Sequence, residues 1–76
     1  MIFIDKELYK NKYGIYSIRN IINGIVYVGQ TSETFQRRYW HHCWKLQNGS
    51  HDNIYLQNSW NKYGNESFVY EILEDI

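Results

Sequence analysis

The chain contains no proline and only one cysteine, Cys43, among its 76 residues. A single cysteine excludes an internal disulfide, which is typical of proteins in a reducing compartment. No apolar run approaches the roughly 20 residues that cross a bilayer, and the start of the chain becomes charged at Asp5, too early for a signal peptide. These absences predict a cytoplasmic protein without a membrane partner.

The chain also lacks an excess of positive or negative charge, because eight basic and eight acidic residues give a net charge of +0 at pH 7. The net charge therefore does not indicate a nucleic-acid partner. The distribution is uneven: residues 31–51 hold three basic residues and three histidines against Glu33 alone, whereas the last ten residues hold three acidic residues and no basic one. A basic segment on a neutral domain is a weak electrostatic indication of DNA binding.

A hairpin pattern occupies the front of the chain. Strand-forming residues at 15–18 and 25–28 flank an Asn- and Gly-rich segment, 20–24. Asn23-Gly24 can supply the positive φ angles that a tight turn requires. We therefore predict a β-hairpin with a loop of about five residues.

Two helical patterns and a third strand pattern follow the hairpin. An apolar stripe at spacings of four and three predicts a helix that ends near Asn48-Gly49. A shorter helix is predicted after a capping segment at 51–53, and residues 67–73 alternate like a strand. The inward residues of the two helices are expected to be Phe35, Tyr39, Cys43 and Leu46, then Leu56, Trp60 and Tyr63.

The predicted fold class is α+β, a small three-stranded antiparallel sheet with helices packed on one face, in the order β-β-α-α-β. We expect a single domain over residues 1–76, with a loosely held arm over 1–12, in which residues 2–4 could form a short strand, and a core over 13–76. The chain stops at Ile76, directly after the last predicted strand. A partner chain or a missing C-terminal segment is therefore expected to complete the fold.

The chemistry of the chain is concentrated in tyrosine, arginine and histidine. Tyr16 and Tyr27 lie on the two predicted hairpin strands, where opposed residues have Cβ atoms about 5 Å apart. A tyrosine that acts as a base needs cationic neighbours or a metal-bound water, since its ordinary pKa is about 10. Arg38 and His42 share one helical face; Arg37 and His41 repeat that spacing one position earlier, and helical geometry alone does not choose between the pairs.

Structural interpretations compete with the functional ones. Trp40 and Trp44 are expected in the core by default, with a base-stacking platform or a protein contact surface as alternatives. His51 is most simply a loop or capping residue, and Cys43 a small hydrophobe. The spacing of the histidines and the single cysteine disfavour a zinc site.

The motifs together resemble the GIY-YIG nuclease superfamily. Gly14-Ile15-Tyr16 is separated by ten residues from Tyr27-Val28-Gly29, and an Arg-x3-His pattern follows on the next helix. The segment 46–64 further resembles the phage homing-endonuclease branch. The resemblance runs from about Tyr13 to Glu74.

The resemblance implies a role for each matching residue. Tyr16 matches the general base, Tyr27 the residue that positions water or phosphate, Arg38 the residue that stabilises the phosphorane-like charge, and His42 the histidine bonded into the tyrosine network. When the family's pattern is aligned on residues 49–51, its arginine and histidine fall on Arg38 and His42 and not on the other pair. Further substrate-binding residues are expected at Gly29, Arg37, His41 and Lys45.

The implied activity is one-metal hydrolysis of DNA with Mg²⁺ or Mn²⁺. The family places a metal-binding glutamate on a helix after the third strand, and no residue of this chain matches it; Glu71 and Glu74 lie in or just after that strand. The metal ligand is therefore unassigned. We expect an endonuclease-type domain that is truncated or weakly active, with a non-catalytic nucleic-acid-binding or regulatory module as the alternative.

Overall fold

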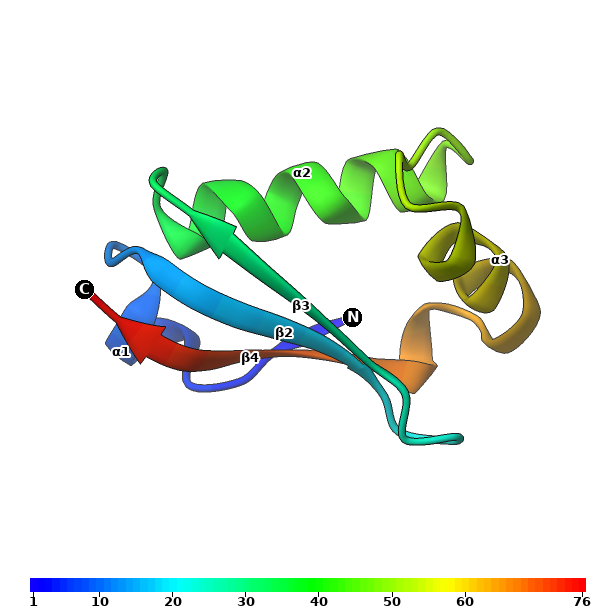
Figure 1. Cartoon of the computed structure of the whole chain (residues 1–76), viewed down its shortest axis with the longest axis horizontal. Helices are drawn as coiled ribbons and strands as arrows, with labels where there is room; N and C mark the ends of the chain where they lie inside the picture. Colours follow the sequence, from blue (N-terminus) through cyan, green and yellow to red (C-terminus); the bar gives the residue numbers. More distant parts are fainter.

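The computed structural model describes residues 1–76 as one mixed sheet with helices on one of its faces (Figure 1). The four strands lie in the order β1-β4-β2-β3; β1 is parallel to β4, and the other pairs are antiparallel. None of the helices has the length and apolar composition that a membrane span requires. The elements are β1 (Ile2–Phe3), α1 (Lys6–Tyr9), β2 (Gly14–Asn20), β3 (Val26–Thr31), α2 (Phe35–Gln47), α3 (Ile54–Tyr63), the 3-10 turn η1 (Asn65–Ser67) and β4 (Phe68–Asp75).

The predicted hairpin is formed by β2 and β3, which are joined by residues 21–25. Its register pairs Tyr16 with Gly29 and Ile18 with Tyr27. Residues two apart on a strand point to the same face, so Tyr16 and Tyr27 lie diagonally on one face of the sheet. The hairpin thus brings both phenol side chains to the side that the helices cover.

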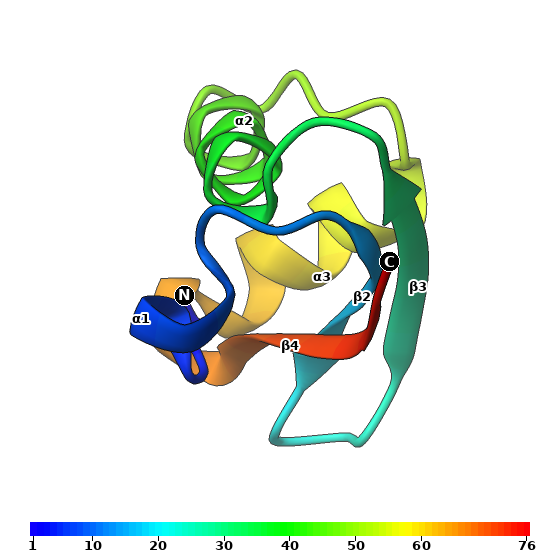
Figure 2. The same cartoon turned by 90° about the vertical axis from the view of Figure 1, so that its left-hand side faces the viewer.

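Helices α2 and α3 pack over that face, as the view in Figure 2 shows. The Thr34 side chain accepts a hydrogen bond from the Arg37 amide at the start of α2, and the Asn53 side chain accepts from two amides at the start of α3. Gly64, with φ 86°, follows α3. Local capping therefore fixes where both covering helices begin.

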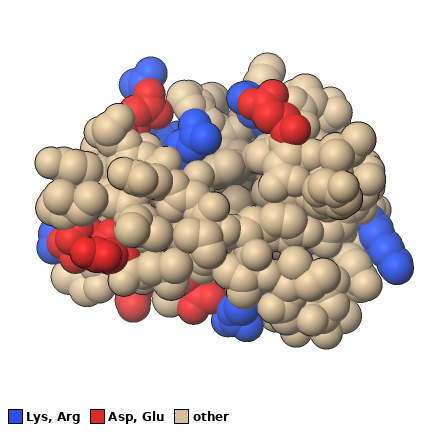
Figure 3. Space-filling model, in the orientation of Figure 1, with Lys and Arg blue, Asp and Glu red and all other residues tan.

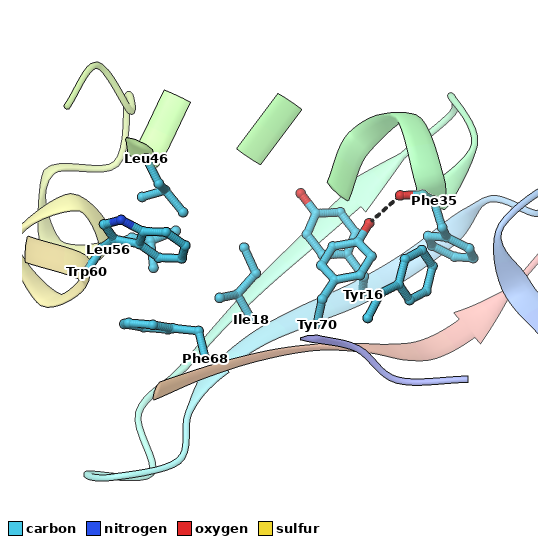
Figure 4. Packing of buried hydrophobic residues seen from close by; sticks show 9 residues of the cluster. Tyr16, Ile18, Phe35, Leu46, Leu56, Trp60, Phe68 and Tyr70 are labelled. Atoms are coloured by element: carbon cyan, nitrogen blue, oxygen red, sulfur yellow. Dashed lines mark hydrogen bonds between the residues drawn. The ribbon is translucent and has the colours of Figure 1, made fainter. Parts of the chain in front are cut away.

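The core lies between the sheet and these two helices (Figure 4). Tyr70 is fully buried and its hydroxyl donates to the Phe35 carbonyl at 3.1 Å, which ties β4 to the first turn of α2. The Tyr16 and Tyr70 ring centroids lie 4.9 Å apart. The side chains shown in Figure 4 include Tyr16, Ile18, Phe35, Leu46, Leu56, Trp60, Phe68 and Tyr70.

The prediction of a loosely held arm over residues 1–12 is wrong, and so is the three-stranded antiparallel sheet. Phe3 is only 7% exposed, and β1 adds a fourth, parallel strand beside β4. The carbonyls of Lys12 and Lys10 accept hydrogen bonds from the amides of Phe35 and Gln36. These amides at the start of α2 have no partner within the helix, so the first twelve residues help to hold α2 in place. The broader α+β class and both predicted helices are confirmed.

The default placement of Trp40 and Trp44 in the core is also wrong. Their side chains are 64% and 54% exposed, while Phe35 and Leu46 fill the inward stripe of α2 as expected. His42 joins that stripe at 7% exposure. The inner face of α2 is therefore partly polar, and its aromatic residues of largest area face outward.

Candidate active site

The hydroxyl of Tyr16 is the centre of a hydrogen-bond cluster between the sheet and α2. The Tyr16 side chain is 3% exposed, and its oxygen lies 2.6 Å from His42 Nε2. Arg38 Nε donates to the same oxygen at 3.3 Å. One turn of α2 thus supplies both groups, because residues four apart lie on the same helical face.

A chain of hydrogen bonds assigns the tautomers of two histidines. The backbone amide of Asn53 can only donate, and it donates to His51 Nδ1 at 3.0 Å. Neutral His51 therefore carries its proton on Nε2, which lies 2.7 Å from His42 Nδ1. That bond in turn assigns the His42 proton to Nε2, facing Tyr16. The Tyr16 oxygen consequently accepts from His42 and from Arg38, and its own hydrogen is left free to point elsewhere.

The electrostatic environment keeps His42 neutral and Arg38 charged. Burial, with smaller contributions from His51 and Arg38, lowers the pKa of His42 from 6.5 to about 3. Burial also lowers the pKa of His51. The hydrogen bond to Tyr16 raises the pKa of Arg38. The cluster therefore contains one fixed positive charge and two neutral imidazoles at pH 7.

Gly29 is required by the position of the Tyr16 ring. A Cβ built on Gly29 would lie 2.4 Å from both Cζ and the hydroxyl oxygen of Tyr16. Real Cβ atoms essentially never approach so closely. The glycine leaves the space in which the hydroxyl lies, next to the open side of the cluster.

A hollow of about 290 Å³ opens beside the cluster, and we call it the main hollow because it borders the Tyr16 hydroxyl group's partners Arg38 and His42. Its walls come from the hairpin, from α2 and from the loop between α2 and α3. This hollow is large enough for a phosphodiester group with water, and it is lined on several sides by hydrogen-bond donors. The basic or imidazole side chains in its lining are Arg38, His41, His42, Lys45 and His51.

Tyr27 lies beside this hollow without lining it. Its hydroxyl is 3.5 Å from the Tyr55 carbonyl, a long hydrogen bond to the start of α3. A smaller hollow of about 70 Å³ joins Tyr27 to Tyr16, His42 and His51. The two phenols therefore border a common space, although no hydrogen bond connects them.

The other candidate residues on α2 lie at the rim or outside it. His41 Nδ1 and Arg37 Nε are each 3.8 Å from carboxylate oxygens of Glu33, and Arg37 does not line the main hollow. Lys45 Nζ lies 3.1 Å from Asp52, whose carboxylate is exposed. In Figure 3 basic and acidic side chains stand next to one another along the upper edge, over α2. The structure thus brings Arg38 and His42, not Arg37 and His41, to Tyr16.

The residues of the chain do not form a metal site by themselves. No group of three histidine, cysteine or acidic side chains is close enough to hold a cation. Asp52 is the one carboxylate in the lining of the main hollow, and it is paired with Lys45. Glu71 forms an ion pair with Arg19 at 2.8 Å. Mg²⁺ prefers several oxygen ligands, so these residues do not match its requirements.

His51 belongs to the cluster, and the interpretation of it as a mere capping residue missed this. Its backbone amide donates to Gln57 Oε1 at 3.1 Å, and Gln57 Nε2 donates to the Leu46 carbonyl at 3.0 Å. The Gln57 side chain, which belongs to α3, therefore connects the loop between the helices to the last turn of α2. The sequence signal was weak, since a histidine nine positions after His42 has no helical relation to it.

Known proteins share the sequence and fold of this chain. The family model for the GIY-YIG catalytic domain matches residues 12–75. Intron-associated endonuclease 1 of Enterobacteria phage T4 is 46% identical over 65 residues, 86% of this chain and 26% of that protein. Two structures of the catalytic domain of endonuclease I-TevI each match 86% of this chain. The first, a mutant, has a TM-score of 0.79 and 46% sequence identity, and the match covers 65% of its own length. The second has a TM-score of 0.80 and 45% sequence identity, and the match covers 68% of its own length. The chain spans about a quarter of the curated relative.

Proposed function

This chain belongs to the family of GIY-YIG catalytic domains, and on that premise we propose that it is a DNA endonuclease domain that hydrolyses phosphodiester bonds. The resemblance inferred from the sequence is thereby confirmed. The observation that carries the proposal is the Tyr16 oxygen, which accepts from both His42 and Arg38 at the edge of a hollow.

Tyr16 is proposed as the group that takes a proton from the attacking water. The donors His42 and Arg38 stabilise negative charge on its oxygen once the phenol proton has left. The resting tautomer of His42 has its proton already on Nε2, so His42 does not remove the Tyr16 proton; that proton leaves toward the hollow. General-base catalysis of this kind contributes about a hundredfold to ten-thousandfold.

Arg38 is proposed to hold the phosphate whose bond is broken. Its Nε is committed to Tyr16, which leaves the two terminal nitrogens of the guanidinium for non-bridging oxygens. The same side chain therefore couples the base to the phosphate and sets their relative position. His41 and Lys45 at the rim, and the backbone at Gly29, are proposed as additional contacts to the substrate, with Arg37 on the outer side of α2.

Tyr27 is proposed to position the attacking water or the phosphate. It borders the small hollow that Tyr16 and His42 also line. The resemblance implies Mg²⁺ or Mn²⁺ as cofactor, which would supply charge to the leaving oxygen. Because the residues of this chain do not form a ligand set for such an ion, we assign no step to it.

A non-catalytic DNA-binding or regulatory module is the second candidate. The observation that favours it is the pairing of Asp52 with Lys45, which leaves the main hollow without a free carboxylate. Such a module would use Arg38 and the rim residues to bind phosphate groups without breaking a bond. The two candidates share the same surface and differ in turnover.

The proposal is tested by incubating supercoiled plasmid with excess protein and Mg²⁺ or Mn²⁺, and by measuring DNA affinity against salt concentration. We expect slow nicking, reduced about a hundredfold or more in Arg38→Ala, and an affinity that falls steeply with salt. Lys62→Ala removes an exposed charge from the end of α3 and is the control. Salt-dependent binding without nicking would favour the second candidate; absence of both overturns the proposal.

A further inference from the structure

The outer face of α2 carries a stripe that alternates basic and aromatic groups. Its residues are spaced by three and four positions along the helix, so they form one continuous row on the surface. Trp40 and Trp44 are the two aromatic members, 64% and 54% exposed. Exposed tryptophans are unusual on a surface that has no partner. The members of this outer stripe are Arg37, Trp40, His41, Trp44 and Lys45.

The outer stripe is continuous with the candidate active site. A hollow of about 460 Å³ is lined by Trp40, His41, Trp44 and Lys45. His41 and Lys45 also line the hollow beside Tyr16. A strand whose phosphate lies next to Arg38 can therefore continue over the shared rim onto the two indole rings.

We propose that Trp40 and Trp44 stack on unpaired nucleobases of the DNA strand whose phosphate is held beside Tyr16, an inference that rests on the proposed function. Residues four apart on a helix are separated by a rise of about 6 Å. Nucleotides of one strand in a duplex are spaced by about 3.4 Å along the axis. The two rings therefore match bases of an extended, unstacked strand and do not match neighbouring bases in a regular duplex.

The charges around the rings favour nucleic acid over a protein partner. Each turn of the outer stripe pairs an indole with a basic or imidazole group, whereas the centres of protein interfaces are depleted of lysine. The carboxylates that contact these groups, Glu33 and Asp52, are exposed. Exposed ion pairs contribute little energy, so phosphate groups can replace the carboxylates. Aromatic rings flanked by cations are the usual composition of single-strand binding surfaces.

The test uses a single-stranded oligothymidylate of about 12 nucleotides, an abasic strand with the same number of phosphates, and a paired duplex, all in EDTA. Affinity is measured by anisotropy of the labelled strand, and contact by quenching of tryptophan emission. Trp60 is only 7% exposed and stacks on Phe68, so it is an internal reference for an unquenched indole. The variants are Trp40→Leu/Trp44→Leu, which removes both rings, and Trp40→Phe/Trp44→Phe, which keeps aromatic faces.

We expect oligothymidylate to bind about tenfold or more tightly than the abasic strand, and the leucine variant to lose this difference. The phenylalanine variant should keep part of it, and the salt dependence should not change, because the phosphate contacts remain. Ile22→Ala, which removes an exposed apolar side chain from the hairpin loop, is the control expected to match the wild type. Circular dichroism checks the fold of each variant.

The inference is overturned if the leucine variant binds oligothymidylate as the wild type does, or if the abasic strand binds equally well. It is also overturned if the leucine variant alters only self-association in sedimentation, which would make the outer stripe a contact between copies of the chain. A wild-type chain with no salt-dependent affinity for any DNA would instead remove the proposed function, and this inference with it.

Discussion

The ring of Tyr16 lies against the bare backbone of Gly29, its partner across the β2–β3 pair. A Cβ on Gly29 would overlap both the Cζ carbon and the oxygen of the phenol, each at 2.4 Å. The same oxygen is 2.6 Å from His42. The hairpin register and the missing side chain at position 29 therefore decide where the candidate base lies.

Gly29→Ala should displace the Tyr16 ring and break its hydrogen bond to His42. We expect the nicking rate to fall about tenfold or more, with a loss of about 1–3 kcal/mol in the free energy of unfolding from overpacking. Both are measured on purified protein, by plasmid nicking and by urea unfolding. Ser32→Ala, in the exposed loop before α2, is the control. An alanine variant with the wild-type rate would show that the ring position is unimportant.

Acid should destabilise the protein through His42. Its pKa is about 3 in the folded state and about 6.5 when unfolded, so between these values the unfolded state binds a proton that the folded state does not. Stability therefore falls as pH decreases from about 6.5 toward 3, by up to about 1.4 kcal/mol per pH unit. Urea unfolding across this range measures the slope. His42→Gln should reduce this slope, and an unchanged slope would show that His42 is not the source of the acid sensitivity.

Asp52→Asn should strengthen DNA binding. The substitution removes a negative charge from the rim of the main hollow and frees Lys45, which now lies 3.1 Å from the carboxylate. We expect the Kd for duplex DNA to decrease about threefold to tenfold at low salt, with a smaller effect at high salt. Glu66→Gln removes the same charge at η1 and should have little effect. Equal changes in the two variants would indicate a general effect of net charge.

Phe3→Ala should destabilise the whole domain. The ring is 7% exposed and lies 4.8 Å from the Tyr70 ring, centroid to centroid. Loss of a buried phenylalanine costs about 3 kcal/mol or more, which urea unfolding detects. Leu8→Ala, on the exposed side of α1, should change stability by less than about 0.5 kcal/mol. Equal stability of the two variants would support the loose arm expected from the sequence.

The elements that the sequence predicted well are those with a local signal. The hairpin has strand formers on both sides of Asn23-Gly24, and α2 has an apolar stripe at helical spacing. β1 has only two residues and pairs in parallel with β4, more than sixty positions away. The short strand expected over residues 2–4 is present, but nothing in so short a segment indicates its partner. The parallel pairing with β4 was therefore unpredictable.

The candidate site depended on the resemblance more than on local patterns. Helical spacing placed Arg38 with His42 and Arg37 with His41 equally well. The register of the resemblance favoured the first pair, and the packing of α2 on the sheet brings that pair to Tyr16. The two tryptophans were expected inside because aromatic rings usually fill cores, yet Phe35 and Leu46 already occupy that face. His51 enters the cluster through a loop held by Gln57, a tertiary contact with no periodicity.

The claim that the Tyr16 hydroxyl takes part in strand cleavage is tested most directly by a single-turnover nicking assay on Tyr16→Phe. The matched control is Tyr13→Phe, which removes a hydroxyl from a half-exposed ring on the same segment. We expect Tyr16→Phe to bind DNA as the wild type does and to nick it about a hundredfold more slowly or not at all, while Tyr13→Phe keeps the wild-type rate. Nicking by Tyr16→Phe at the wild-type rate would show that the Tyr16 hydroxyl takes no part in strand cleavage.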